Sequence, residues 1–330
     1  MGRYPITSAM TTKPTRRLLI VGVTGNVGVE ILRYALSSAS PFTHIRGLAR
    51  TTSKLPQDLL EAPNAEFIDA DAYDVQAYER ACEDVDSVIC AYRGIASLGL
   101  EAQLILMRAA DRCGVKQMVL ASWNYDLSKL KLGDHEPYDM YISVLNQAEF
   151  NKTLKVSFIV SGVFFDVLWW FGIWDAEGER FKTYGTGDEK WRLTSREDAA
   201  RFAVETLRDG KRSGIQYVAS ESLSLNEISK VFAEVKYGDA SKTQPVEKLG
   251  SVEDCQALFL KERKEKGKAR YLEYIWLGYV YFTNSGIWDF TPSDNKALIE
   301  GSSEPWQTSS MRQFISENLE MIDSPPEKNQ

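Results

Sequence analysis

The sequence predicts an α/β protein: a Rossmann-type doubly wound parallel sheet followed by a smaller C-terminal α/β substrate domain. Two observations lead to this prediction. Short apolar runs alternate with helical patterns through the first half of the 330-residue chain, as is typical of βαβ units. A glycine-rich segment also follows the first apolar run and opens the first helical pattern, which is where a nucleotide-binding loop lies.

Six apolar runs predict the strands of the parallel sheet. They are Leu18–Gly22, Ile45–Ala49, Glu66–Ile68, Ser87–Ala91, Met118–Ala121 and Val156–Val160. Between the first two runs, Val27, Ile31 and Ala35 keep helical spacing. Parallel strands joined through a helix make right-handed crossovers, so this rhythm predicts a single sheet with helices packed against it.

After Gly162 the rhythm of the sequence changes. Helices are expected from about Arg196, near Leu225–Val235, over Val252–Lys266 and near Ser309–Leu319, with a strand at Ile215–Ala219. We expect a disordered tail over 1–16, a nucleotide-binding domain over 17–161 and a mainly substrate-binding domain over 162–330. Whether strands of the last part return to the first domain stays open.

Composition and charge exclude several classes of protein. The chain is 44% hydrophobic and 26% charged, as in ordinary globular proteins. Its formal net charge of -7 argues against nucleic acid and anionic membrane surfaces as partners. The most apolar run, Ser157–Trp174, contains Asp166 and two glycines, which favours a buried strand followed by an apolar loop over a membrane span. We expect a monomer or homodimer.

The cysteines and histidines argue against a metal centre. Four cysteines are scattered without a CxxC pair, and the chain has only two histidines. This pattern provides neither a disulfide framework nor a zinc site. Reduced thiols and the lack of a secretory signal lead us to expect a cytoplasmic protein without a bound metal.

The glycine loop is the strongest functional signal. Gly22, Gly25 and Gly28 form a G-x-x-G-x-x-G pattern between a predicted strand and a predicted helix. Glycines allow the backbone N–H groups to approach a pyrophosphate, and the helix N-terminus favours the negative charge. We therefore expect a dinucleotide to bind the segment that comprises Gly22, Thr24, Gly25, Asn26, Val27 and Gly28.

The end of the second predicted strand indicates the cofactor. Arg50 stands where a carboxylate would bind the ribose of NAD, and no acidic residue lies nearby. The run Arg50–Lys54 offers two cations, with Ser53 among its hydroxyl groups. Because an arginine at this point accommodates a 2′-phosphate, the sequence favours NADP(H) as the cofactor.

These features together resemble a known family. The loop GVTGNVG, the strand-end Arg50, the segment Asp69–Asp71 and the later Thr194–Asp198 are similar to the NmrA-like and isoflavone-reductase-like group, an atypical branch of the short-chain dehydrogenase/reductase superfamily. The resemblance runs from about Arg17 to Leu319. Val23 departs from it, since the family usually has alanine there.

The resemblance implies further cofactor and substrate contacts. It places Asp71 and Ala72 near the adenine, and Ala91, Tyr92 and Arg93 along the nicotinamide ribose. It also implies that three residues face the nicotinamide and the substrate, namely Ser122, Trp123 and Asn124.

The catalytic pattern departs from the superfamily. Short-chain dehydrogenases commonly use Tyr-x-x-x-Lys, in which lysine lowers the pKa of the tyrosine. Tyr141 matches the tyrosine, but Leu145 stands where the lysine is expected. Tyr141 is therefore a weak candidate acid, and a helix residue that packs against the cofactor domain is the competing interpretation.

An aromatic band after Gly162 provides candidate pocket residues. Aromatic side chains stack on flat substrates and attract cations, although such a band also suits a core. With Trp123 and Asn124, the candidates are Phe164, Phe165, Trp169 and Trp170.

The sequence therefore predicts an NADPH-dependent reductase of a small organic molecule. The resemblance implies a role in secondary metabolism, and the missing lysine favours an imine, iminium or alkaloid intermediate, because a cationic acceptor needs no strong acid. Two alternatives stay open: a non-catalytic NADP-sensing regulator of the NmrA type, and an isomerase or cyclase that retains the cofactor.

Overall fold

The computed structural model describes residues 16–92, 97–170 and 172–324. Its centre is a seven-stranded sheet in the order β11-β6-β5-β4-β1-β2-β3, and every pair of neighbours is parallel. The strands are β1 (Arg17–Val21), β2 (His44–Ala49), β3 (Ala65–Asp69), β4 (Ser87–Cys90), β5 (Gln117–Asn124), β6 (Lys155–Val160) and β11 (Gly214–Tyr217). The six predicted strands and the Rossmann-type order are confirmed.

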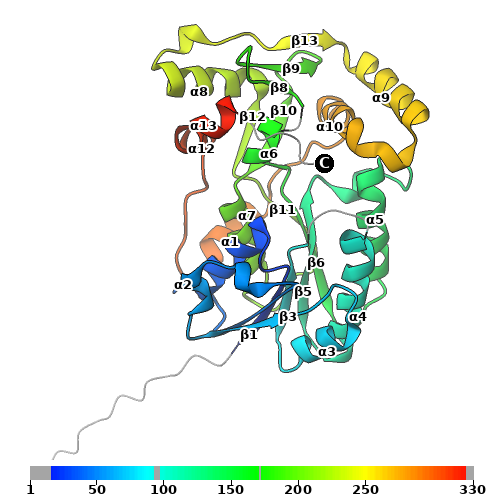
Figure 1. The fold of residues 1–330 in the computed structure, drawn as a ribbon, viewed down its shortest axis with the longest axis vertical. Coiled ribbons are helices and arrows are strands. Elements are labelled where there is room, and N and C mark those ends of the chain that lie inside the picture. Colours follow the sequence, from blue (N-terminus) through cyan, green and yellow to red (C-terminus); the bar gives the residue numbers. More distant parts are fainter. Residues whose placement is uncertain (1–15, 93–96, 171, 325–330) are drawn as a thin grey trace, which may run out of the picture.

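Helices cover both faces of this sheet. Helix α1 (Asn26–Leu36) packs against α7 (Arg196–Thr206) on one face. The opposite face carries α3 (Val75–Cys82), α4 (Gln103–Arg112) and α5 (Glu136–Ala148), as Figure 1 shows. The buried residues of α1 include Val27, Ile31 and Ala35, so the helical spacing in the sequence marks the face that packs on the sheet.

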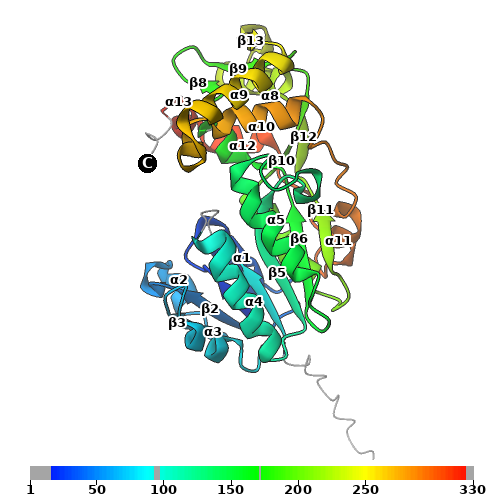
Figure 2. The same cartoon turned by 90° about the vertical axis from the view of Figure 1, so that its right-hand side faces the viewer.

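The second half builds a smaller unit beyond one end of the sheet (Figures 1 and 2). It has two three-stranded sheets, β12-β10-β7 and β13-β9-β8. Their strands are β7 (Val163–Phe164), β8 (Trp174–Asp175), β9 (Arg180–Tyr184), β10 (Lys190–Thr194), β12 (Glu221–Ser224) and β13 (Glu247–Gly250). The helices around them are α6 (Phe165–Trp170), α8 (Leu225–Tyr237), α9 (Val252–Lys266), α10 (Ile275–Asn284), α12 (Met311–Glu317) and α13 (Leu319–Asp323).

The short elements lie mainly in connections. They are η1 (Thr52–Lys54), α2 (Gln57–Leu60), the π-helix η2 (Ser97–Ala102), η3 (Leu127–Lys129), η4 (Ala240–Lys242), η5 (Lys268–Glu273) and α11 (Asn295–Gly301).

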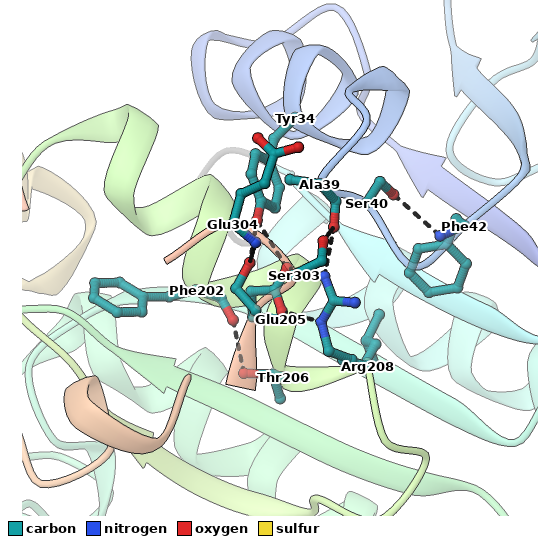
Figure 3. Close-up of polar contacts among 12 residues, drawn as sticks. Tyr34, Ala39, Ser40, Phe42, Phe202, Glu205, Thr206, Arg208, Ser303 and Glu304 are labelled. Atoms are coloured by element: carbon teal, nitrogen blue, oxygen red, sulfur yellow. Dashed lines mark hydrogen bonds and ion pairs between the residues drawn. The ribbon is translucent and has the colours of Figure 1, made fainter. Parts of the chain in front are cut away.

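The chain crosses between the two parts more than once. Strand β11 pairs with β6, and α11 packs on α7, so both belong with the large sheet. Figure 3 shows a polar cluster that fastens the segment after α11 to α1 and α7. There the Tyr34 hydroxyl donates to Glu205 at 2.8 Å, and the Ser303 hydroxyl donates to the Ala39 carbonyl at 2.8 Å. The C-terminal segment thereby returns to the first domain.

The N-terminal boundary also differs from the expectation. Arg16 was predicted to lie in the tail, but its guanidinium donates to the carbonyl oxygens of Leu207 and Arg208. Arg16 therefore belongs to the folded protein, because two hydrogen bonds hold its side chain on the end of α7. Residues 1–15 lie outside the described part of the chain.

The apolar run Ser157–Trp174 folds differently from the predicted strand and loop. After β6 it forms the short strand β7 and then helix α6. Across the described residues, we find no helix with the length and apolar character that crossing a membrane requires.

Candidate functional site: a nucleotide cleft at the glycine loop

The three glycines of the loop are required for different structural reasons. Gly22 has a φ of 81°, which side chains disfavour. A Cβ atom on Gly28 would lie 2.2 Å from the Gly22 carbonyl oxygen, so only glycine lets α1 approach β1 this closely. Gly25 is exposed, and its nearest atom to an added Cβ is the Gly22 carbonyl oxygen at 3.3 Å. Gly22 and Gly28 therefore shape the loop, while Gly25 leaves its outer surface open.

The loop presents the N-terminus of α1 to the cleft. Gly25 is the N-cap residue, no side chain caps the helix, and no acidic residue lies in its first turn. The first N–H groups of a helix have no partner within the helix and carry partial positive charge. An uncapped N-terminus beside an open glycine surface can therefore bind an anionic group such as a pyrophosphate.

A cationic recess lies beside this loop. Its volume is about 280 Å³, and its lining residues are Thr24, Arg50, Thr51 and Lys54. Among the described residues, neither Arg50 nor Lys54 forms an ion pair with a carboxylate. The structure thus brings together the two predicted cations and Thr24, and Thr51 replaces Ser53, whose exposed side chain does not line the recess.

Asp69, which was not among the predicted site residues, positions this recess. Asp69, at the end of β3, accepts hydrogen bonds from the Thr52 backbone N–H at 2.8 Å and from the Thr52 hydroxyl at 2.6 Å. These bonds lower the pKa of Asp69. Because Thr52 lies between Arg50 and Lys54, Asp69 holds the turn that carries both cations. The segment Asp69–Asp71 marked this position in the sequence, but only Asp71 was predicted to lie near the cofactor.

The residues predicted to lie near the adenine and the ribose differ in their exposure. Asp71 is exposed after β3, and its carboxylate accepts from the Tyr73 backbone N–H. Tyr92 follows β4, its hydroxyl bonds with that of Tyr78, and its ring lies against Gly22. Ala72 and Ala91 are buried. Arg93 lies outside the described residues.

The end of β5 is irregular, which matters for the substrate side. The β5–β6 register shifts between Leu120 and Asn124. Within this bulge Trp123 has a φ of 33°, a conformation that side chains adopt at a cost and that concentrates at functional sites. The Asn124 amide donates to the Tyr279 hydroxyl at 2.5 Å. Tyr279 belongs to α10, so this bond joins the two halves of the protein.

The structure corrects the expectation for Ser122. Its side chain is buried, and its hydroxyl donates to the Ile159 carbonyl of the neighbouring strand at 2.8 Å. The Ser122 hydroxyl therefore bonds the neighbouring strand β6, and its buried side chain presents no exposed donor to a cofactor or substrate.

Tyr141 lies inside the protein and not at an open site. It is 6% exposed on α5, and burial raises its pKa far above the ordinary value for a phenol, with the nearby Tyr279 adding to the effect. Leu145, one turn further along α5, is a partly buried hydrophobic residue. A phenol with a raised pKa is a poor proton donor at neutral pH, so the geometry favours the packing interpretation of Tyr141.

The four aromatic residues after Gly162 do not form one box. Trp169 is 1% exposed and packs on Trp174 and Phe181 inside the second half of the protein. Trp170 lies on the surface, where its indole N–H points to the Met321 sulfur at 3.1 Å. Neighbouring residues on a helix point about 100° apart, which separates these two side chains. The prediction that Trp169 and Trp170 both line one substrate pocket is therefore wrong.

Phe164 and Phe165 are both buried, and neither lines the cationic recess. Phe164 ends β7, and the guanidinium of Arg196 lies 4.8 Å from its ring centroid. Phe165 borders a second cavity, although most of its side chain is buried.

The chain is similar to known proteins in sequence and in fold. The chain is 25% identical to the probable pinoresinol-lariciresinol reductase 3 of Arabidopsis thaliana over 205 residues, which cover 60% of this chain and 65% of that protein. Its fold is similar to that of the NADPH-dependent quinone oxidoreductase of Escherichia coli complexed with NADPH, with a TM-score of 0.68, 17% identity and coverage of 92% and 99% of the two chains. It is also similar to leucoanthocyanidin reductase from Vitis vinifera with NADPH, with a TM-score of 0.67, 16% identity and coverage of 91% and 98%.

The family model described as the NmrA-like family matches residues 14–250, from the glycine loop through β13. The chain therefore belongs to the NmrA-like family, as the motifs in its sequence implied.

Proposed function

We propose that this protein is an NADPH-dependent reductase of a small organic molecule. The observation that carries the proposal is the recess in which Arg50 and Lys54, without carboxylate partners among the described residues, lie beside the open glycine loop. The similarity to a curated reductase and to reductases solved with NADPH supports the same activity.

The residues present fit NADPH on both of its anionic groups. The uncapped first turn of α1 would hold the pyrophosphate, and a side chain at exposed Gly25 would occupy that surface. Arg50, Lys54, Thr24 and Thr51 would hold the 2′-phosphate, because two cations and two hydroxyl groups suit a dianion. The cofactor supplies the hydride equivalent for reduction.

The substrate side supports an acceptor that needs little help from an acid. Asn124, held by Tyr279, and the strained Trp123 lie at the end of β5, where an open parallel sheet binds its ligands. Tyr141 is buried with a raised pKa. We therefore propose that the acceptor is an iminium, or an imine that has taken up a proton to become one, of the kind found in alkaloid metabolism. Its cationic C=N⁺ group accepts hydride at carbon and becomes a neutral amine once the reactants are held close together.

Arg50→Asp is expected to weaken NADPH binding at least about tenfold, since one charge-assisted hydrogen bond contributes about 1.5–3 kcal/mol and the new carboxylate repels the phosphate. NADH binding should change little. Titration calorimetry with both cofactors tests this, and Arg108→Asp, on exposed α4, is the control with the same change of net charge. Equal affinities of the wild type for NADPH and NADH would contradict the assignment.

Tyr141→Phe is expected to lower turnover less than about tenfold, whereas positioned general acids contribute about 10²–10⁴-fold. NADPH oxidation would be measured against a panel of cyclic imines and enones, and the variant compared on the accepted substrate. A thousandfold loss in a folded variant would instead favour carbonyl reduction with Tyr141 as the acid. If the wild type binds NADPH but oxidises it with no compound, the regulator and isomerase hypotheses take its place.

A further inference from the structure

A second cavity lies beside helix α1, which follows the glycine loop. It has a volume of about 300 Å³. Its lining comes from helices α1, α6, α7 and α12, and includes Glu30, Phe165, Asp166, Arg196, Glu197 and Phe314. Glu30 stands one helical turn after Asn26 of the glycine loop, so the helix that follows the loop also lines this cavity.

The one cation in this lining is already paired. The Arg196 guanidinium donates to Asp166 at 2.5 Å and 3.2 Å and lies over the Phe164 ring. In this contact the two charges neutralise each other, so the described lining carries no unpaired cation for an anionic ligand. The arrangement also shows that the wall of the cavity accommodates a planar cation between a carboxylate and an aromatic ring.

Two carboxylates in the lining have no such partner. Within the described part of the chain, neither Glu30 nor Glu197 forms a hydrogen bond or an ion pair through its side chain. Burial raises the pKa of Glu30, and the neighbouring charge of Glu197 raises it further; Arg33, Arg196 and Arg201 offset this only in part. Glu30 is partly buried and Glu197 is exposed. A positive ligand group placed between the two carboxylates would relieve their mutual repulsion.

The remaining wall provides apolar contact. The rings of Phe165 and Phe314 meet edge to face with centroids 5.7 Å apart. Both border the same cavity as Glu30 and Glu197, although they come from different elements. A ligand that fits this lining has an apolar ring or chain for the phenylalanines and a positively charged donor for the carboxylates. The volume is at the lower end of small-molecule sites, so the ligand is compact.

We propose that this cavity binds a compact organic cation, a protonated amine carried on an aromatic or aliphatic body. The ammonium group lies at Glu30 and Glu197, and the body lies on the partly exposed ring of Phe314, which the buried Phe165 ring supports. The proposal goes beyond reductase activity, because it assigns a second ligand site that forms from side chains of the folded chain without the cofactor.

The test uses benzylamine as the cationic probe, benzyl alcohol as its neutral counterpart and benzoate as the anionic one. Binding is measured by ligand-observed NMR at low ionic strength on the full chain without cofactor. Wild type should bind benzylamine at least about tenfold more tightly than benzyl alcohol, which is the effect of one charge-assisted contact, and should not bind benzoate. NADPH titration on the same samples reports separately on the proposed function.

The variant Glu30→Gln/Glu197→Gln should lose about tenfold in benzylamine affinity and keep its affinity for benzyl alcohol. Glu149→Gln, at an exposed position at the end of α5, is the control for loss of a carboxylate outside the cavity. Because both glutamates lack partners, the fold should be unaffected, and circular dichroism checks this. Phe314→Ala should weaken benzylamine and benzyl alcohol alike. Equal binding of benzylamine and benzyl alcohol, unchanged affinity in the double variant, or no binding of benzylamine would each overturn the proposal.

Discussion

Gly25→Val is expected to abolish NADPH binding while the protein stays folded. Gly25 is exposed at the N-terminus of α1 and has a φ of -77° and a ψ of 160°, an extended conformation that valine adopts readily. An added Cβ would lie 3.3 Å from the Gly22 carbonyl oxygen, which needs only a small adjustment. The rest of the side chain would cover the surface that the pyrophosphate needs. Fluorescence titration with NADPH and circular dichroism measure the two effects.

Gly28→Ala is the informative comparison for this variant. Its methyl group would lie 2.2 Å from the Gly22 carbonyl oxygen and 2.9 Å from the Val23 Cα atom. Both are backbone atoms, so α1 must move away from β1, and this variant should lose thermal stability as well as NADPH binding. A folded Gly25→Val variant with normal NADPH affinity would contradict the assignment of the loop.

The second large effect concerns stability at acidic pH and depends on His135. Its ring is fully buried among five aromatic rings, those of Tyr138, Phe259, Tyr279, Phe282 and Trp288. Neither ring nitrogen has a hydrogen-bond partner among the described residues. Burial, together with the positive charge of Arg263, lowers the pKa of His135 from 6.5 to about 3. The neutral ring is therefore the form that the folded protein accommodates.

This lowered pKa fixes the direction of the pH dependence. Between pH 6.5 and pH 3 the unfolded chain binds a proton at His135 that the folded chain does not. The free energy of unfolding should therefore fall with decreasing pH, by about 1.4 kcal/mol per pH unit from this residue, or about 2 kcal/mol between pH 6.5 and pH 5. Urea unfolding at a series of pH values measures it.

The variant His135→Phe removes the titrating group and keeps an aromatic ring in the cage. It should lose less stability than wild type as the pH falls from 7 to 5, and His135→Gln provides a second variant in case the larger ring does not fit. His44→Gln is the natural control, since His44 is exposed at the start of β2 and is the other histidine of the chain. Identical pH profiles of the wild type and both His135 variants would show that His135 does not set the acid stability.

The sequence by itself determined the parallel sheet, the glycine loop and the family. These features depend on local patterns: Val27 and Ile31 recur at helical spacing, and Gly22, Gly25 and Gly28 meet needs that arise within a few residues. Arg50 could be predicted to contact the cofactor for the same reason, because the end of a strand beside a glycine loop lies at the same edge of such a sheet.

Only the tertiary structure decided which side chains reach the cleft. The Ser122 hydroxyl is bonded to Ile159 on a neighbouring strand, and Asp69 acts on the cofactor recess through Thr52. Trp169 packs in a core to which distant residues such as Phe232 contribute. The aromatic sequence around Trp169 therefore could not show whether it lines a pocket or fills a core. A strand residue or an aromatic residue satisfies its burial and hydrogen bonding with whatever the fold brings next to it.

The second cavity could not be predicted from the sequence either. Glu30 and Glu197 meet because α1 packs on α7, and Phe314 reaches them only because the C-terminal segment returns past the first domain. No local pattern in the sequence predicts that these three side chains lie close together. Each of these residues alone would be an ordinary surface or core residue. They form a candidate site because the packing of distant segments places them around one cavity, and that packing depends on the whole fold.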